Sequence, residues 1–320
     1  MFKTPILFII FNRLDTTNTV FEEIRKIKPK QLFIAADGPR ENIIDEIHIC
    51  ELTRNIVIEN IDWECEVKTL FRNENLGCGK AVSGAISWFF ENVEEGIILE
   101  DDCLPHESFF LYCETMLNRY RLVENIGIIT GNNFQNGIQR GDGSYYYSKY
   151  SHIWGWATWK STWALYDFEM KEWQNFKSNL LLSSCNNNMI EFNYWKEIFE
   201  MVYLRKINTW DYQLLFSMWF NNLITICPNV NLISNIGFGE SATHTTDRNS
   251  KLSNLEFFKY EDDKIPSKIE IDRLADDYTF NSIFQLTIVE EFNVENRKNN
   301  NLSVRDKLYL LRQRILSKFF

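Results

Sequence analysis

Three consecutive acids, Glu100, Asp101 and Asp102, follow a run of aliphatic residues in the stretch GIILEDDCLPHESFF at 96–110. Adjacent carboxylates repel one another, so one or more of them should stay protonated or point to water unless a cation is present. Mg²⁺ and Mn²⁺ prefer carboxylate oxygens and are often held by one or two protein ligands together with the phosphates of a substrate. The triplet therefore suggests a divalent-cation site, and the alternative is a solvated acidic turn.

Positively charged side chains that could meet a diphosphate lie at two other places. Arg13 follows the first apolar run of the chain, and Lys80 stands at the start of a predicted helix. The preceding Gly77-Cys78-Gly79 would let a phosphate approach the N-terminus of that helix closely. The GCGK sequence lacks the spacing of a Walker loop and is a weak signal by itself.

A further acid, Asp211, stands between Trp210 and Tyr212 in the stretch NTWDYQLLF. Aromatic neighbours remove a carboxylate partly from water, which favours a role as a general base. The same residue could instead cap the N-terminus of the helix that follows it. Both interpretations stay open on the local sequence.

Tryptophans and one histidine complete the set of candidate residues. Trp154, Gly155 and Trp156 lie in a Trp-rich segment at 148–167. Indole faces there could stack on a sugar ring or a base, or could pack in the core. His244, in the polar stretch GESATHTT, could contact a metal ion or a phosphate, or could be a surface histidine.

The elements that must position these residues alternate between strands and helices in the first part of the chain. Continuous apolar runs predict parallel strands that are covered on both faces, and a helical apolar period predicts the helices between them. The predicted strands are 5–11, 31–37, 64–71 and 95–102, with helices at 16–27 and 81–93. This order is typical of an open α/β sheet that binds ligands at the carboxyl ends of its strands. Arg13, Asp37 and the acidic triplet should therefore meet at one edge.

Composition and charge narrow the class of protein. A chain of 320 residues with 45% hydrophobic content is long enough for a sizeable core. Its net charge of −10 argues against a nucleic-acid binder, which needs a clustered basic surface. The seven cysteines include no Cys-x-x-Cys pair, which favours a reducing, cytoplasmic compartment. The N-terminal apolar run is too short for a signal peptide or a membrane span.

In the stretches that contain these residues, the chain resembles nucleotide-diphospho-sugar glycosyltransferases of the GT-A fold. It is similar to the Golgi N-acetylglucosaminyltransferase that begins complex N-glycans and to bacterial family-2-like glycosyltransferases. The matching stretches cover most of 4–247 and are, in order, PILFIIFNR, AADG, GKAVSGAISWFF, ILEDDCLPHESFF, IWGWATWKSTW, WDYQ and NIGFGESATHT. The resemblance implies a GT-A, Rossmann-like α/β fold with a mixed central sheet flanked by helices.

The resemblance also implies roles for the donor site. Arg13 and Asp37 would hold the nucleotide, with Asp37 near the base or ribose. Glu100 and Asp101 would line the sugar-nucleotide site, and Asp102 would bind Mn²⁺ or Mg²⁺ that bridges the diphosphate. The donor favoured by the resemblance is a UDP-sugar.

The implied reaction is metal-dependent, inverting transfer of a hexosyl or N-acetylhexosaminyl group, with Asp211 as the base that deprotonates the acceptor. The acceptor would be a glycan or a lipid-linked sugar in bacterial surface polysaccharide synthesis. The usual Asp-x-Asp motif is Glu-Asp-Asp here, and no Golgi anchor is found, so an N-glycan substrate is not implied.

Other functions remain as alternatives. A sugar nucleotidyltransferase would also use a metal ion and an α/β sheet, and a non-catalytic module would bind a nucleotide sugar without transfer. A glycoside hydrolase is disfavoured, because adjacent acids on one strand end cannot stand on opposite sides of a glycosidic bond.

The chain is expected to form one GT-A domain over 1–290, with a nucleotide-sugar-binding half at 1–125 and an acceptor-binding half at 126–290. Residues 291–320 would form a linker and a basic amphipathic C-terminal helix, with apolar residues from Val304 to Phe319 on one face. Such a helix could lie on the inner face of the cell membrane, pack on its own domain or contact a second copy in a homodimer.

Overall fold

The first four strands form a parallel half-sheet, as the apolar runs predict. The computed structural model describes residues 2–238 and 252–284. The strands lie in the order β3-β2-β1-β4, and each neighbouring pair is parallel. Their bounds are β1 Ile6–Ile10, β2 Gln31–Ala36, β3 Glu66–Phe71 and β4 Glu95–Glu100. The helices between them are α1 Leu14–Ile27, α2 Glu46–Glu59 and α3 Gly77–Asn92.

Four later strands extend the same sheet and make it mixed. The full order is β3-β2-β1-β4-β8-β6-β9-β7, in which β8 is antiparallel to both of its neighbours. The added strands are β6 Ile126–Thr130, β7 Tyr145–Ser148, β8 Trp156–Trp159 and β9 Ile224–Pro228. A separate antiparallel pair joins β5 Cys103–Pro105 to β10 Ile233–Asn235. The prediction of an α/β fold with a mixed central sheet flanked by helices is confirmed.

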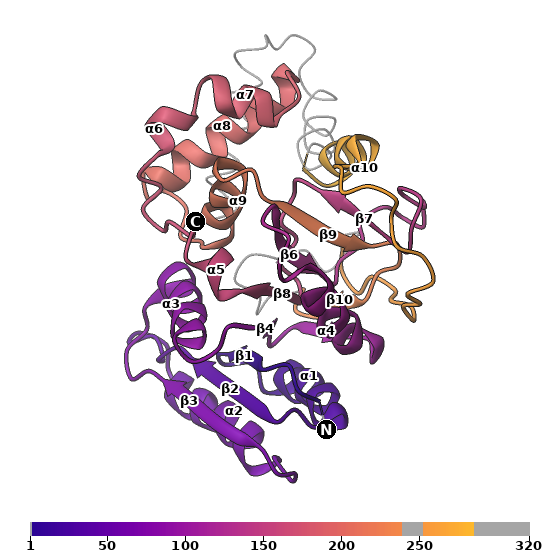
Figure 1. The fold of residues 1–320 in the computed structure, drawn as a ribbon. Helices are drawn as coiled ribbons and strands as arrows, with labels where there is room; N and C mark the ends of the chain where they lie inside the picture. The colour runs from indigo at the N-terminus through magenta and orange to yellow at the C-terminus, as the bar shows by residue number, and fades with distance from the viewer. Residues whose placement is uncertain (1, 239–251, 285–320) are drawn as a thin grey trace, which may run out of the picture.

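Helices cover both faces of the sheet, because successive residues of a strand point to opposite sides. Leu7 of β1 packs in a core with α3, α8 (Met189–Tyr203) and α9 (Asp211–Phe220). Ile6 and Phe8 pack in a second core with α1 and α4 (Ser108–Tyr120). Figure 1 shows α6–α9 together at one end of the molecule and β1–β3 at the other. The remaining helical segments are α4 Ser108–Tyr120, α5 Lys160–Trp163, α6 Trp173–Phe176, α7 Asn179–Ser184, α8 Met189–Tyr203, α9 Asp211–Phe220, α10 Arg273–Thr279 and the π-helical η1 Phe280–Phe284.

The antiparallel strand β8 brings a late part of the chain to the carboxyl edge of the parallel strands. Its first residue, Trp156, pairs with Ile98 near the end of β4 and with Thr130 at the end of β6. The loop before β8 therefore lies beside the residues that follow β4 and β6. This arrangement assembles one site from segments that are far apart in sequence.

Gly155, at the entry to β8, is a position that only glycine fits. Its φ is +62°, and a Cβ there would lie 2.5 Å from Ile233 Cδ1. We expect Gly155→Ala to lower the free energy of unfolding by about 2–5 kcal/mol, the sum of left-handed strain and overpacking. Gly137→Ala, with φ +78° and no atom within 4 Å of the new Cβ, is the matched control for strain alone and should cost about 1–2 kcal/mol. Equal losses in urea titrations of the two variants would contradict this account.

Two predictions fall on parts of the chain outside the described residues. These are His244 and the linker with its C-terminal helix at 291–320. Among the residues that are described, no helix is both long enough and apolar enough to cross a membrane.

Candidate functional site

The acidic triplet is held at the end of β4 by one guanidinium group. Arg13, between β1 and α1, donates to Asp102 Oδ2 at 2.6 Å and lies 3.5 Å from Asp101 Oδ1. The other oxygen of Asp101 accepts the Phe11 N–H at 3.1 Å. The ends of β1 and β4 are thus tied together through their polar side chains, at the edge where the sequence predicts them to meet.

Negative charge exceeds positive charge at this edge. Burial, together with the charges of Asp102, Asp101 and Asp211, raises the pKa of Glu100 to about 8. Burial also raises the pKa of Asp101 to about 7, although the Arg13 charge opposes this. A bound cation would relieve the repulsion, so the donor set fits a hard divalent ion with few protein ligands. Within residues 2–238 and 252–284, no group of three or more His, Cys, Asp or Glu forms a complete metal cage.

The end of β10 and the two residues after it also contact Asp102, a contact that the sequence did not predict. The main-chain oxygen of Asp102 accepts the Ile236 N–H at 2.9 Å, and Asn235 Nδ2 lies 3.5 Å from its Oδ1. Gly237 packs so closely on the Asp102 carboxylate that a Cβ at this position would overlap it. The end of β10 therefore fixes the orientation of Asp102.

Asp37, after β2, binds the N-terminus of α3 through its carboxylate. The Leu76 N–H and the Gly77 N–H both donate to it, at 3.0 and 3.1 Å. Asp37 is 9% exposed, and its role toward a nucleotide stays a prediction. Lys80 is exposed in the first turns of α3, and its role also stays a prediction.

Gly77 and Gly79 of the GCGK stretch allow the segment Asn208–Thr209 to approach the start of α3 closely. The sequence had suggested that a phosphate would approach there. Asn208 Oδ1 accepts the Gly79 N–H at 3.1 Å, and a Cβ on Gly79 would lie 2.8 Å from the Thr209 main-chain oxygen. Together with Asp37, these contacts occupy the N-terminus of α3. The close approach seats the loop that leads to Asp211, and a diphosphate contact near this helix end stays a prediction.

Asp211 is the first residue of α9, but it does not cap the helix. The N-cap position is Trp210, and the Asp211 carboxylate accepts the Thr209 hydroxyl and no N–H of the helix. The charge of Asp211 contributes to raising the pKa of Glu100 and of Cys78, in which burial is the larger cause. Asp211 therefore lies near the acidic triplet, and the capping alternative is excluded by its hydrogen bonding.

Trp156 is a core residue, which corrects its prediction as a ligand contact. It is 1% exposed and stacks on Trp210 with ring centroids 5.8 Å apart. Tyr166 donates its hydroxyl to the Trp210 main-chain oxygen at 3.1 Å. Trp156 thus supports the residue that precedes Asp211, and of the two neighbouring tryptophans only Trp154 reaches a cavity.

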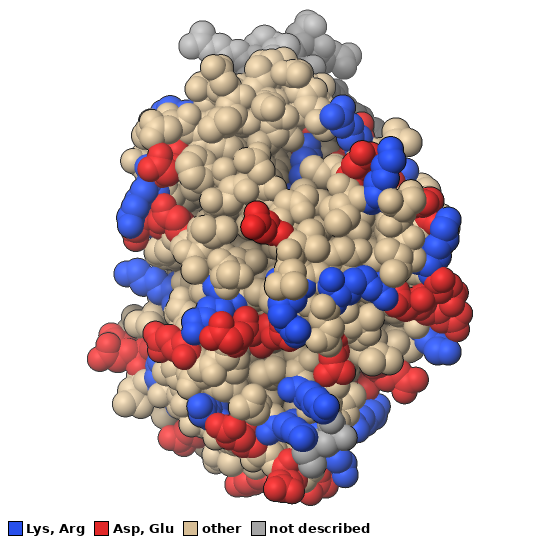
Figure 2. Space-filling model, viewed as in Figure 1, with Lys and Arg blue, Asp and Glu red and all other residues tan. Residues whose placement is uncertain are grey.

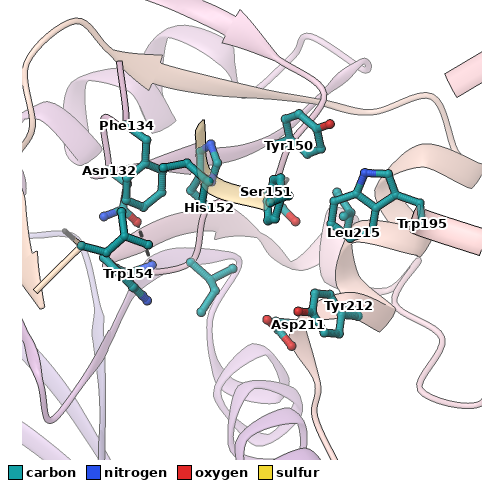
Figure 3. Close-up of a pocket in the computed structure, with 14 residues that line it drawn as sticks. Asn132, Phe134, Tyr150, Ser151, His152, Trp154, Trp195, Asp211, Tyr212 and Leu215 are labelled. Atoms are coloured by element: carbon teal, nitrogen blue, oxygen red, sulfur yellow. Dashed lines mark hydrogen bonds between the residues drawn. The ribbon is translucent and has the colours of Figure 1, made fainter. Parts of the chain in front are cut away.

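That cavity, of about 160 Å³, opens beside Asp211. Figure 3 shows two groups of side chains that face each other across it, one carrying Trp154 and one carrying Asp211. Neither Arg13 nor any member of the acidic triplet lines it. Its lining residues are Asn132, Phe134, Tyr150, Ser151, His152, Ile153, Trp154, Trp195, Asp211, Tyr212, Leu215, Leu252, Ile283 and Phe284.

Two polar lining residues, Asn132 and His152, were not predicted from the sequence. Asn132 follows β6 and accepts the Trp154 N–H at 2.9 Å, while its Nδ2 is buried without a partner among the described residues. The His152 ring packs edge-on against Phe134, and burial lowers the pKa of His152 to about 4. The sequence feature that could have predicted them is their position at the carboxyl edge of the sheet. Asn132 follows β6, and His152 precedes β8.

The low pKa of His152 makes stability depend on pH in a definite direction. The unfolded chain takes up this proton near the ordinary pKa of 6.5, whereas the folded chain resists it until about pH 4. Stability should therefore fall as the pH falls through this window, by about 2–3 kcal/mol at pH 4.5. Replacing His152 by Gln removes this contribution, so the variant should lose less stability than the wild type between pH 7 and 4.5. His48→Gln, on an exposed position of α2, is the control, and parallel curves for His152→Gln and wild type would refute the prediction.

Comparisons with known proteins find only solved structures of low similarity. No family model and no curated protein matches the chain. Mouse xyloside xylosyltransferase 1 is 10% identical with a TM-score of 0.34, over 68% of this chain and 81% of that one. TarS of S. aureus is 9% identical with a TM-score of 0.36, over 69% and 57%. The 4-diphosphocytidyl-2C-methyl-D-erythritol synthase of Anaerococcus prevotii is 9% identical with a TM-score of 0.31, over 51% and 74%. At such scores the assignment of function depends on the residues of the site.

Proposed function

We propose that the protein is a metal-dependent, inverting glycosyltransferase that uses a nucleotide-diphosphate sugar, with UDP as the favoured nucleotide. The observation that carries the proposal is the position of Asp211. Its charge contributes to raising the pKa of Glu100 at the carboxyl end of β4, and its side chain also lines the aromatic cavity. A base in transfer between two substrates has to stand between them, and the position of Asp211 between the acidic triplet and the cavity supports this role.

The donor would bind at the carboxyl edge of β1, β2 and β4. Asp102 would hold Mn²⁺ or Mg²⁺ together with the donor diphosphate, and the ion would offset the charge that develops on the departing nucleoside diphosphate. Arg13 would meet the same phosphates, and Glu100 and Asp101 would line the sugar-nucleotide pocket. Contacts from Asp37 and Lys80 to the nucleotide, and from His244 to the ion, are further parts of this proposal.

Asp211 would act on the acceptor. Its carboxylate takes the proton of an acceptor hydroxyl while the hydroxyl oxygen bonds to the anomeric carbon of the donor sugar. The bond from that carbon to the diphosphate breaks, and its electron pair leaves with the nucleoside diphosphate. Attack from the face opposite the leaving group inverts the anomeric configuration.

Binding of a panel of nucleotide sugars tests the donor assignment. We expect UDP-sugars to raise the Tm of the full chain in the presence of Mn²⁺ or Mg²⁺ and to do so much less in EDTA. Release of diphosphate from UTP and a sugar 1-phosphate would instead support a nucleotidyltransferase. Metal-dependent binding with neither transfer nor slow donor hydrolysis would support a non-catalytic module.

The cellular setting belongs to the same proposal. A glycan or lipid-linked acceptor in bacterial surface polysaccharide synthesis would place the protein in the cytoplasm at the inner face of the membrane, and 302–320 would contact that face. Vesicles with anionic lipids should bind the full chain more strongly than a chain truncated after residue 301. Equal binding would remove the membrane contact and leave the proposed reaction unaffected.

A further inference from the structure

We infer that the cavity beside Asp211 takes one sugar ring of an uncharged acceptor and that Asn132 helps to select it. This inference rests on the proposed function, because it takes Asp211 as the base that meets the acceptor hydroxyl.

The size of the cavity and its two kinds of wall fit a single sugar ring. A volume of about 160 Å³ is many times that needed for one water molecule and leaves room for one sugar ring. Aromatic side chains such as Trp154 and Tyr212 offer apolar faces, and Asn132, His152 and Asp211 offer polar atoms. A sugar ring has the matching combination of apolar C–H faces and hydroxyl edges.

The charges around the cavity favour a neutral ligand. Asp211 is the one charged residue among the described residues that line it. A nearby cation, Lys149, is buried and bound to Glu191 at 2.6 Å, so its charge is already paired. Among the described residues that line the cavity, none would supply a counter-ion to a carboxylate or phosphate on the acceptor ring, and such a group would be repelled by the like charge of Asp211.

The amide of Asn132 carries a hydrogen-bond donor that is unpaired among the described residues. Its Oδ1 must face the Trp154 N–H, because an N–H can only donate, and this fixes which side of the amide carries Nδ2. Asn132 is fully buried, and its Nδ2 has no partner among the described residues. An unpaired buried donor is costly, and because Asn132 lines the cavity, a hydroxyl or ring oxygen of a bound sugar is the partner that we infer for it.

The ring of His152 adds to the same polar wall without adding charge. In the neutral ring, one nitrogen can donate a hydrogen bond and the other can accept one. Phe134 packs edge-on against both His152 and Trp154, with ring centroids 4.8 and 5.4 Å away, and so keeps their relative positions. The polar wall is thus built in advance of ligand binding.

The test compares neutral with anionic sugars on the full chain. The probes are methyl β-D-glucoside, methyl β-D-galactoside and methyl N-acetyl-β-D-glucosaminide against methyl β-D-glucuronide and N-acetylneuraminic acid. Binding is followed by saturation-transfer NMR with UDP and Mn²⁺ present. We expect at least one neutral glycoside to bind at least about tenfold more tightly than either anionic sugar. Equal or tighter binding of an anionic sugar, or no binding of any neutral glycoside, would overturn the inference without any variant being needed.

A variant assigns the effect to Asn132. Asn132→Asp keeps an oxygen for the Trp154 N–H but removes the Nδ2 donor, so neutral glycosides should bind at least about tenfold more weakly. Asn55→Asp, on the exposed surface of α2, adds the same charge elsewhere and should bind them as the wild type does. Wild-type affinity in Asn132→Asp would overturn the role of Asn132.

Failure of this inference differs from failure of the proposed function. Metal-dependent binding and slow hydrolysis of a UDP-sugar, without selective binding of neutral glycosides, would refute the acceptor class and leave the glycosyltransferase proposal in place. Selective glycoside binding without any metal-dependent binding of UDP or UDP-sugars would refute the glycosyltransferase proposal.

Discussion

Replacing Asp211 by Asn is expected to lower the rate of sugar transfer by about 10²–10⁴-fold while donor binding stays near that of the wild type. The substitution keeps the shape of the side chain and removes its capacity to take a proton from the acceptor hydroxyl. The Thr209 hydroxyl can still donate to the remaining amide oxygen, so the start of α9 should keep its structure. The measurement is kcat and KM with the best UDP-sugar, together with the Kd of that donor.

The control for this variant is Asp277→Asn, an exposed acid on α10 that lines no cavity described here. It should transfer sugar at the wild-type rate. Near-normal transfer by Asp211→Asn would show that another group accepts the proton, and the assignment of Asp211 as the base would be wrong.

Replacing Asp102 by Asn is expected to weaken donor binding in the presence of Mn²⁺ by about 10–100-fold, with little change in EDTA. Loss of one carboxylate charge removes the main protein ligand proposed for the ion. Since the contact of Arg13 at 2.6 Å also loses its negative charge, the Tm of the variant has to be measured beside its affinity. Isothermal titration with UDP at several Mn²⁺ concentrations separates the two effects.

The Asp102→Asn and Asp211→Asn variants should lose different properties, so comparing them separates metal binding from catalysis. Asp102→Asn should lose metal-dependent donor affinity, whereas Asp211→Asn should lose catalysis with the donor still bound. An Asp102→Asn protein whose UDP affinity responds to Mn²⁺ as the wild type does would exclude Asp102 as the metal ligand.

The parallel half of the sheet was predictable because its strands are covered on both faces. Runs such as PILFIIF contain too little alternation for a half-exposed strand, and they are closed by polar residues at one end. The rule that ligands gather at the carboxyl ends of such strands then brings Arg13 and the acidic triplet together. The contacts from Arg13 to Asp101 and Asp102 agree with that reasoning.

The cavity and the position of Asp211 were harder to predict, because they depend on contacts between segments that are far apart in the sequence. Asn132 and His152 become neighbours only after β8 enters the sheet antiparallel between β4 and β6, and no local pattern reports this pairing. The glycines at 77 and 79 indicated a close approach, but not that Asn208 would make it. Trp154 and Trp156 are both tryptophans, so residue type does not distinguish them. Trp154 precedes β8 and lines the cavity, whereas Trp156 is the first residue of β8 and lies in the core.

The central claim is that one divalent ion and a nucleoside diphosphate are bound among the acids at the end of β4. A crystal structure of the full chain with Mn²⁺ and UDP, with anomalous data to locate manganese, tests it most directly. We predict a manganese peak beside the Asp102 carboxylate, a diphosphate within reach of Arg13, and Asp211 on the side of the aromatic cavity. A structure with UDP bound elsewhere, or with no manganese near Asp102, would contradict the account.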